Sequence, residues 1–596
     1  MALCAACVRG APPGLPSPEP VADVPIEVPN LTLPPAREEF EDVPTARSLS
    51  LRERAAQLIM PWIGGEYWAA DDSAMAAALR LAADEGVGGF VVGLGGSAYD
   101  LAAKFNTLQR AAKLPLLIAA DLESGPSARI RGGTAFPGNM ALGASGRERD
   151  AYDVGGVIAL EGRAVGVHMV FAPVVDVNNN PANPIINIRS FGEDPARVGA
   201  LASAFIRGLR EHGMLATAKH FPGHGDTGTD AHIALPVISA GRARLDSVEL
   251  VPFRSAVRAG VDAVMSAHIA MPGLTGGSDL PATLSGAVLD TLLRGDLGFR
   301  GLVVTDALNM GAIVARYGAA QSAVLALKAG ADILLMPTDA RQAINAVVAA
   351  VERGELSEAR LDSSVARVLA AKARAGLFRR RLADLGVIPR VVGIRAHEDL
   401  ARQVTQRTIV LVRDSLNLVP LAAERRRRAV VIAYGDENNA GIGGAFAAAL
   451  RAGGAGRVQT LRLWPASGPA SYDSARTAAA QASAVFVLVA ARPAAWRPDA
   501  VTMPDSLAAL ITQLARAGAP VITVALGSPY LLNQVPLTPG YLAAWAANEA
   551  TERAAADAIL GNAEITGRLP VALPPDYPRG AGLTRAARPA AGPTSP

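Results

Sequence analysis

The most constraining feature of the chain is a long alternation between short apolar runs and longer segments rich in alanine and leucine, which begins near Leu49. Short continuous apolar runs are typical of strands buried on both faces. The segments between them are typical of helices, so that the two together predict a parallel sheet. Seven runs repeat in this way, at 88–93, 115–121, 169–177, 214–221, 262–269, 301–308 and 331–337. They predict a (β/α)₈ barrel of the TIM type in which one strand is weak or irregular.

Polar side chains follow five of these runs at the point where each predicted strand ends. They are Asp121 and Glu123 after the second run, Asp176 and Asn178–Asn180 after the third, Lys219 and His220 in the fourth, His268 in the fifth and Asp306 in the sixth. In a parallel barrel all of these ends lie on one face, where barrel enzymes build their active sites. One such residue could merely begin a loop, but polar residues at the same end of five strands predict a functional site.

A second series of strand-like runs begins near His397, after a basic, proline-containing stretch that is typical of a linker. The runs are TIVLVRD, RAVVIAYGD, VQTLRLW, SAVFVLVAA, PVITVALG and YLAAWAA. Their alternation with helical segments predicts an open three-layer α/β sandwich. A glycine-rich turn at 441–446 is weak evidence for a nucleotide site when it stands alone. The predicted organisation is an N-terminal tail (1–45), a barrel (46–378), a linker (379–398), a sandwich (399–578) and a disordered tail (579–596).

The composition excludes several classes of protein. With 596 residues, half of them hydrophobic, the chain is globular and too long for one ordinary domain. A net charge of +3 gives no reason to expect nucleic acid as a partner. No apolar run reaches the roughly 18 residues that a membrane span needs. The two cysteines, Cys4 and Cys7, leave the rest of the chain without a disulfide or a thiolate metal ligand.

The N-terminal segment leaves the compartment open. Small residues precede Cys7 and a proline-rich stretch (12–35) follows it, as in a lipoprotein signal whose beginning is missing. A tail without an export role would look the same. We therefore expect a cell-envelope or exported protein, with the cytoplasm as the alternative, and predict no oligomeric state.

The segment KHFPGHGDTGTDAH (219–232) holds three of the seven histidines. His220 and His224 have the spacing of a helical zinc pair, but the proline and glycine between them break a helix, so no metal site is expected. The segment instead predicts a strand end followed by a glycine-hinged loop that presents Asp230 and His232. A carboxylate so placed can fix the imidazole tautomer and suit it to general acid/base work. The alternative is a capping aspartate beside a surface histidine.

Asp306 ends a strand-like run that would otherwise be buried, in GLVVTDALNM (301–310). A carboxylate at that end of a barrel strand can act as a nucleophile toward the anomeric carbon of a sugar. Alone, it could equally be a hydrogen-bonding strand terminator.

These motifs carry a resemblance to a known family. The segments KHFPGHGDTGTDAH, INIRSFGEDP (186–195) and VVTDALNM (303–310) resemble the signatures of glycoside hydrolase family 3, and more narrowly those of its β-N-acetylglucosaminidase branch. GNAEITGRLPVALP (561–574) resembles the closing motif of the second domain in that family. The resemblance spans roughly residues 49–575. Around Asp121 the chain reads DLESGPSAR where the family usually reads DQEGGRV, which weakens the expectation for Arg129.

The resemblance implies a role for each matching residue. Asp306 corresponds to the nucleophile that forms a covalent glycosyl-enzyme, and His232 to the general acid/base, held by Asp230. The residues that correspond to sugar ligands of the terminal subsite are Asp121, Arg129, Arg189, Lys219 and His220. The implied activity is that of a retaining exo-β-N-acetylglucosaminidase acting on peptidoglycan fragments or chitooligosaccharides, with no metal or organic cofactor.

Three alternatives to this activity remain open. An imidazole does not repel an anion as a carboxylate would, so phosphate could replace water as the acceptor and make the chain a phosphorylase. A β-glucosidase of the same family is another alternative. The third is a sugar-binding protein without catalysis, against which the presence of both Asp306 and His232 argues.

Overall fold

The computed structural model describes residues 43–588 of the chain. The expectations for Cys7, for the proline-rich stretch 12–35 and for residues 589–596 fall outside this part. Within residues 43–588, no helix combines the length and the apolar character that crossing a bilayer demands.

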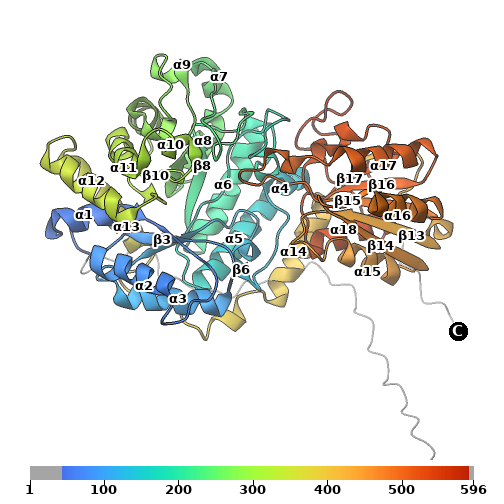
Figure 1. Ribbon diagram of the computed structural model, residues 1–596, viewed down its shortest axis with the longest axis horizontal. Coiled ribbons are helices and arrows are strands. Elements are labelled where there is room, and N and C mark those ends of the chain that lie inside the picture. The colour runs from blue at the N-terminus through green and yellow to red at the C-terminus, as the bar shows by residue number, and fades with distance from the viewer. Residues whose placement is uncertain (1–42, 589–596) are drawn as a thin grey trace, which may run out of the picture. The chain divides into compact units, whose positions relative to one another are not determined.

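A closed ring of parallel strands forms the first half of the described chain, drawn from blue to yellow-green in Figure 1. Seven of its strands lie within the seven predicted runs: β3 (Gly89–Val92), β5 (Leu117–Ala120), β7 (Met169–Val170), β8 (Leu215–Phe221), β9 (Ala263–Ser266), β10 (Leu302–Val304) and β11 (Leu334–Leu335). Each strand pairs with the next in the order β3, β5, β7, β8, β9 and β10. The barrel-type fold expected from the alternation is thus confirmed.

The irregular eighth strand lies at the start of the barrel. It consists of β1 (Ile59–Met60) and β2 (Trp62–Ile63), which are separated by Pro61. β2 pairs with β3 and β1 pairs with β11, while Val304 forms a bridge to Ile333, so the pairing runs round the whole ring. Proline has no N–H to donate to a ladder, which explains why this strand is split into two short pieces.

Helices cover the outside of the ring and are positioned by local sequence signals. The longest barrel helices are α5 (Glu148–Ala164), α6 (Pro195–Glu211) and α13 (Glu358–Arg374). α6 begins with Asp194, whose carboxylate accepts hydrogen bonds from the N–H groups of Ala196 and Arg197, and with Pro195 in its first turn. The other barrel helices are α1 (Leu51–Gln57), α2 (Ser73–Arg80), α3 (Ala98–Ala111), α4 (Asn139–Ser145), α7 (Arg242–Ser247), α8 (Leu250–Arg258), α9 (Pro272–Thr275), α10 (Gly311–Val314), α11 (Gly318–Ala329) and α12 (Ala340–Glu352).

A six-stranded sheet forms the second half, in the order β12-β17-β16-β15-β13-β14. All neighbours are parallel except β12, which runs antiparallel to β17. Alternate strand residues enter two separate apolar clusters, one packed against α16 and α17 and the other against α15 and α18. The three-layer sandwich is therefore confirmed. Its elements are β12 (Val410–Asp414), β13 (Arg428–Tyr434), β14 (Arg457–Leu463), β15 (Ala484–Val489), β16 (Val521–Ala525), β17 (Gly540–Ala543), α14 (Arg395–Thr408), α15 (Gly444–Ala452), α16 (Pro469–Ala480), α17 (Asp505–Arg516) and α18 (Glu549–Leu560).

One segment of this half differs from expectation. Residues 579–588, assigned above to a disordered tail, instead pair with the sheet. Leu583 forms an antiparallel bridge to Leu411 of β12, and Arg585 forms an ion pair of 3.0 Å with Asp414. The glycine-rich turn at 441–446 is occupied by the protein itself, because the carboxylate of Glu552 accepts hydrogen bonds from two of its N–H groups. The two N–H groups at the start of α15 are thus satisfied by a side chain of the chain itself.

Candidate active site

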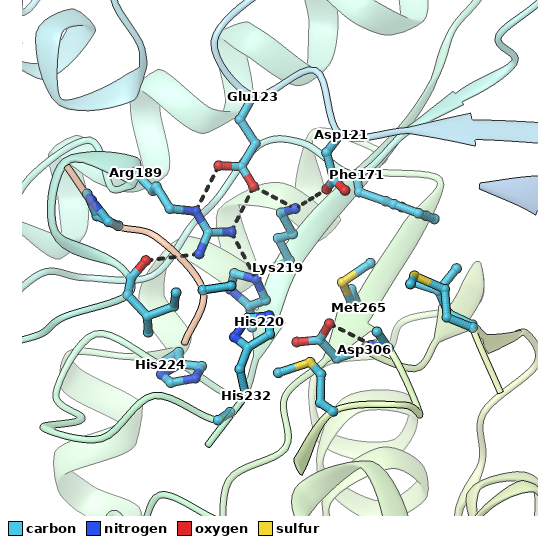
Figure 2. A pocket seen from close by; sticks show the side chains of 18 of the residues that line it. Asp121, Glu123, Phe171, Arg189, Lys219, His220, His224, His232, Met265 and Asp306 are labelled. Atoms are coloured by element: carbon cyan, nitrogen blue, oxygen red, sulfur yellow. Dashed lines mark hydrogen bonds and ion pairs between the residues drawn. The ribbon is translucent and has the colours of Figure 1, made fainter. Parts of the chain in front are cut away.

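A cavity of about 390 Å³ opens at the carboxyl ends of the barrel strands (Figure 2). It brings together all eight of the residues that the sequence singled out for the site: Asp121, Arg129, Arg189, Lys219, His220, Asp230, His232 and Asp306. The strand-end pattern selected four of the eight, which are Asp121, Lys219, His220 and Asp306, and the structure places these four on one cavity.

One wall of the cavity is an arc of alternating charges. Glu123 lies between Arg189 and Lys219, and Asp121 lies beyond Lys219 (Figure 2). Lys219 Nζ is 2.8 Å from Asp121 Oδ1 and 2.7 Å from Glu123 Oε1. Arg189 donates two hydrogen bonds to Glu123, from Nε to Oε2 at 2.9 Å and from Nη2 to Oε1 at 2.8 Å. Arg129 is more remote, because its Nη2 lies 3.6 Å from Asp121 Oδ2.

Glu123 and Lys219 of this arc hold each other in the charged form. Burial alone would raise the pKa of Glu123, but the neighbouring Arg189 and Lys219 hold the pKa of this carboxyl well below its ordinary value. Burial would likewise lower the pKa of Lys219, but Asp121 and Glu123 raise it. Charged groups fixed in this way present strong donors and acceptors whose directions are set before any ligand arrives.

Replacing Glu123 with glutamine is expected to lower the free energy of unfolding by roughly 3 kcal/mol at neutral pH, because two largely buried cations lose their shared partner. The folded-state pKa of Glu123 is depressed, so the stability it contributes is present above its ordinary value of 4.5 and is lost as the pH falls. The difference between wild type and Glu123→Gln should therefore be larger at pH 7 than at pH 3.5, as measured by urea unfolding. Glu355→Gln, in an exposed pair with Arg353, is the matched control. An equal difference at both pH values would contradict the charged role.

Asp306 occupies the floor of the cavity, just after β10. Its Oδ1 accepts a hydrogen bond of 2.8 Å from the N–H of Ala307. Burial would raise the pKa of Asp306, but the neighbouring His220 and His268 and the hydrogen bond from Ala307 outweigh it and lower the pKa to about 2. The carboxylate is therefore ionised at neutral pH, as a nucleophile must be.

A buried aspartate beneath the floor orients the two histidines of the strand end. Asp176 Oδ2 is 2.7 Å from His220 Nδ1, and Asp176 Oδ1 accepts a hydrogen bond of 2.7 Å from the N–H of His224. The Nδ1 atom of His224 lies 2.7 Å from Thr227 Oγ1. Each Nδ1 thus has its own protein partner. Among residues 43–588, no group of histidine, cysteine and carboxylate side chains is arranged to hold a metal ion.

The loop that follows β8 carries the Asp230–His232 pair over the cavity. His232 Nδ1 lies 2.7 Å from Asp230 Oδ1, which also accepts a hydrogen bond of 2.9 Å from the backbone N–H of His232. This arrangement leaves Nε2 as the nitrogen available for proton transfer. The loop packs closely at Gly225, where a Cβ would lie 1.7 Å from the carbonyl oxygen of Val177.

Comparison with known proteins places the chain in a family. The model of the glycosyl hydrolase family 3 N-terminal domain matches residues 50–371, and that of the C-terminal domain matches residues 409–586. The chain belongs to glycosyl hydrolase family 3. The family resemblance carried by the sequence motifs is thereby confirmed.

Several relatives of this family 3 chain have names that bear on its chemistry. A β-N-acetylglucosaminidase/β-glucosidase from Cellulomonas fimi is 35% identical over 343 residues, which cover 56% of this chain and 61% of the relative. The chain thus spans about three fifths of the length of that relative. A family 3 β-N-acetylglucosaminidase structure from Paenibacillus sp. is 33% identical with a TM-score of 0.80, and the match covers 88% of this chain and 99% of that one. A β-glucoside phosphorylase structure is 26% identical with a TM-score of 0.77, over 88% of this chain and 95% of that one.

The cavity lining of this family 3 chain also includes Glu123 and Trp496, while Asp176 and His268 contact residues of the lining from outside it. None of these four was among the eight site residues. Glu123, Asp176 and His268 follow strand ends, so the pattern that found Asp121 and Asp306 identifies them as well. Trp496 is different, because it comes from the second sheet domain and lies on a loop after β15. Nothing in its sequence surroundings, ARPAAWRPD, points to a site in the barrel.

Proposed function

We propose that this family 3 chain is a retaining exo-β-N-acetylglucosaminidase that removes terminal N-acetylglucosamine from peptidoglycan fragments or chitooligosaccharides. The observation that carries the proposal is the pairing of an ionised, buried carboxylate with a carboxylate-bound imidazole on one cavity. Asp306 supplies the first and His232 the second. No metal or organic cofactor is needed for the steps that follow.

In the first step, Asp306 attacks the anomeric carbon while the bond from that carbon to the leaving oxygen breaks. His232, protonated on both nitrogens, donates the proton of Nε2 to the leaving oxygen. The hydrogen bond from Nδ1 to Asp230 stabilises the imidazolium before transfer and fixes the tautomer after it. The product of this step is a covalent glycosyl ester on Asp306 and a free alcohol.

In the second step, a water molecule attacks the same carbon from the face that the alcohol has left. His232 Nε2, now unprotonated, takes a proton from this water, and the ester bond to Asp306 breaks to regenerate the carboxylate. Two inversions give net retention of configuration, so the sugar leaves as its β-anomer. The histidine ends the cycle protonated and ready for another substrate.

The charged arc is suited to hold the terminal sugar. Lys219 and Arg189 offer N–H donors, and Asp121 offers an acceptor, at fixed positions on one side of Asp306. His220 adds an imidazole that Asp176 orients. Directed contacts of this kind reject a sugar that lacks the matching hydroxyl, because a buried polar group would then lose its partner. We assign these residues, with Arg129 at the edge of the arc, to the terminal subsite.

The named relatives support the N-acetylglucosaminidase activity over other members of the family, since both the Cellulomonas fimi relative and the Paenibacillus structure carry that name. The first of these names also includes β-glucosidase. A β-glucosidase activity is therefore the nearest alternative in substrate.

Phosphorolysis is the second candidate reaction. Its support is the histidine acid/base, which does not repel a phosphate anion at the acceptor position, together with the likeness to a structure named β-glucoside phosphorylase. In that reaction phosphate replaces water in the second step, and the sugar leaves as its 1-phosphate.

Turnover of p-nitrophenyl β-glycosides separates these candidates. We expect release of p-nitrophenol from the N-acetylglucosaminide at a kcat/KM at least tenfold above that from the glucoside. In phosphate buffer we expect free N-acetylglucosamine, measured by chromatography against the sugar 1-phosphate. A sugar 1-phosphate as the main product would establish the phosphorylase instead, and no turnover of either glycoside would overturn both proposals.

A further inference from the structure

We propose that Trp496, on a loop of the second sheet domain, is a positioning residue that holds the Asp230–His232 pair in place for proton transfer. The inference rests on the proposed acid/base role of His232. It assigns the second domain a part in the chemistry that the barrel alone does not perform.

The first observation is a hydrogen bond between the two domains. The backbone N–H of Trp496 donates to Asp230 Oδ2 at 2.9 Å. The other oxygen of that carboxylate, Oδ1, accepts from the backbone N–H and from Nδ1 of His232. Both oxygens of Asp230 are thus engaged, and within residues 43–588 the partner from outside the loop that follows β8 is Trp496. This partner fixes the rotation of the carboxylate, and through it the plane of the imidazole.

The second observation is the packing of the rings. The indole of Trp496 meets the imidazole of His232 edge to face, with the ring centroids 4.8 Å apart and an interplanar angle of 63°. The indole is nevertheless 65% exposed, and it lines the cavity together with Pro493 and Ala495. It therefore lies beside the group that protonates the leaving oxygen, where the departing alcohol must pass.

The third observation is the backbone conformation of the loop. Trp496 has a φ of +62°, in the left-handed region that a bulky residue rarely adopts. The turn is held on one side by the N–H of Arg497, which donates to the carbonyl oxygen of Ala494 at 3.1 Å. On the other side, the guanidinium of Arg497 lies 3.1 Å from Asp436 Oδ2. The unusual φ is what aims the N–H of Trp496 at Asp230.

Two variants that both lack the indole distinguish the contribution of the backbone N–H from that of the ring. Trp496→Gly keeps the N–H and adopts a positive φ without strain. Trp496→Pro has no N–H and a φ fixed near −65°, so it cannot make the hydrogen bond to Asp230. The readout is the ratio of kcat/KM for a substrate with a poor, alkyl or sugar, leaving group to that for an activated aryl N-acetylglucosaminide.

We expect this ratio to fall about tenfold in Trp496→Pro relative to Trp496→Gly, the order expected when a hydrogen bond to a charged group is lost. A structural defect would lower kcat/KM equally for both substrates and leave the ratio unchanged. A defect in proton transfer lowers the ratio, because an activated leaving group needs little help from an acid. Trp496→Phe should keep a ratio closer to the wild-type value than Trp496→Gly, because it restores a ring beside His232.

A fourth variant tests the inference in case the loop fails to fold with proline. Trp496→Val keeps the N–H but disfavours a positive φ, so its ratio should fall in the same direction by a smaller factor. Equal ratios in the glycine, valine and proline variants would overturn the inference while the wild-type turnover still supports the proposed function. If the wild-type protein turned over no N-acetylglucosaminide, the proposed function would fail, and the inference with it.

Discussion

Replacing Asp306 with alanine is expected to lower the turnover of an aryl N-acetylglucosaminide by on the order of 10⁴-fold or more, as the loss of a covalent nucleophile does in other enzymes. The reason lies in the floor of the cavity, where this carboxylate is kept ionised with a pKa of about 2 by His220 and His268. Initial rates at neutral pH measure the loss of turnover. The midpoint of thermal unfolding, compared with that of the wild type, checks that the variant is folded.

Azide provides a sharper test of the same role. The alanine variant leaves room for a small anion where the carboxylate stood, so azide should restore turnover of an activated aryl substrate and give the α-glycosyl azide by a single inversion. The matched control is Asp279→Ala, an exposed aspartate paired with Arg316, which should keep wild-type rates. Near-normal activity of Asp306→Ala without azide would remove this residue as the nucleophile.

Replacing His232 with alanine should slow substrates with poor leaving groups by about 10²–10⁴-fold and activated aryl substrates far less, because general acid help matters most when the leaving oxygen is basic. The measurement is a series of aryl N-acetylglucosaminides with leaving groups of increasing basicity. A steeper dependence of kcat/KM on that basicity than in the wild type is the expected result.

The control for this series is His212→Ala, since His212 ends α6 and bonds the carbonyl oxygen of Gly208 outside the cavity. It should leave the slope of the series at its wild-type value. An equal loss for all leaving groups in His232→Ala would count against the acid role and would point to a role in binding alone.

The family resemblance, and not the strand pattern, supplied Arg129 and Arg189. The strand pattern predicted the barrel, the sandwich and the grouping of Asp121, Lys219, His220 and Asp306 at one end of the barrel strands. It succeeded because parallel strands buried on both faces are continuous apolar runs, and because their carboxyl ends share one face of a barrel. A polar residue at such an end, as with Asp121 or Asp306, is then placed by topology alone. The roles of these residues still depend on the experiments above.

Two features could not be predicted for physical reasons. The eighth strand is split at Pro61 into pieces of two residues each, too short to give a periodic signal. Trp496 and His232 are 264 residues apart in the sequence (496 minus 232) and belong to different domains. Their contact is set by tertiary packing. Local sequence carries no trace of such contacts.

The contacts of residues 579–588 with β12 bear on whether the protein associates with itself in solution. β12 is one of the two outer strands of the second sheet, and an uncovered outer strand is a template on which another molecule can add its own strand. The bridge from Leu583 to Leu411 and the ion pair of Arg585 cover part of this edge. A shortened version for expression should therefore keep the chain to residue 588, since a cut at 578 would uncover the edge and favour self-association.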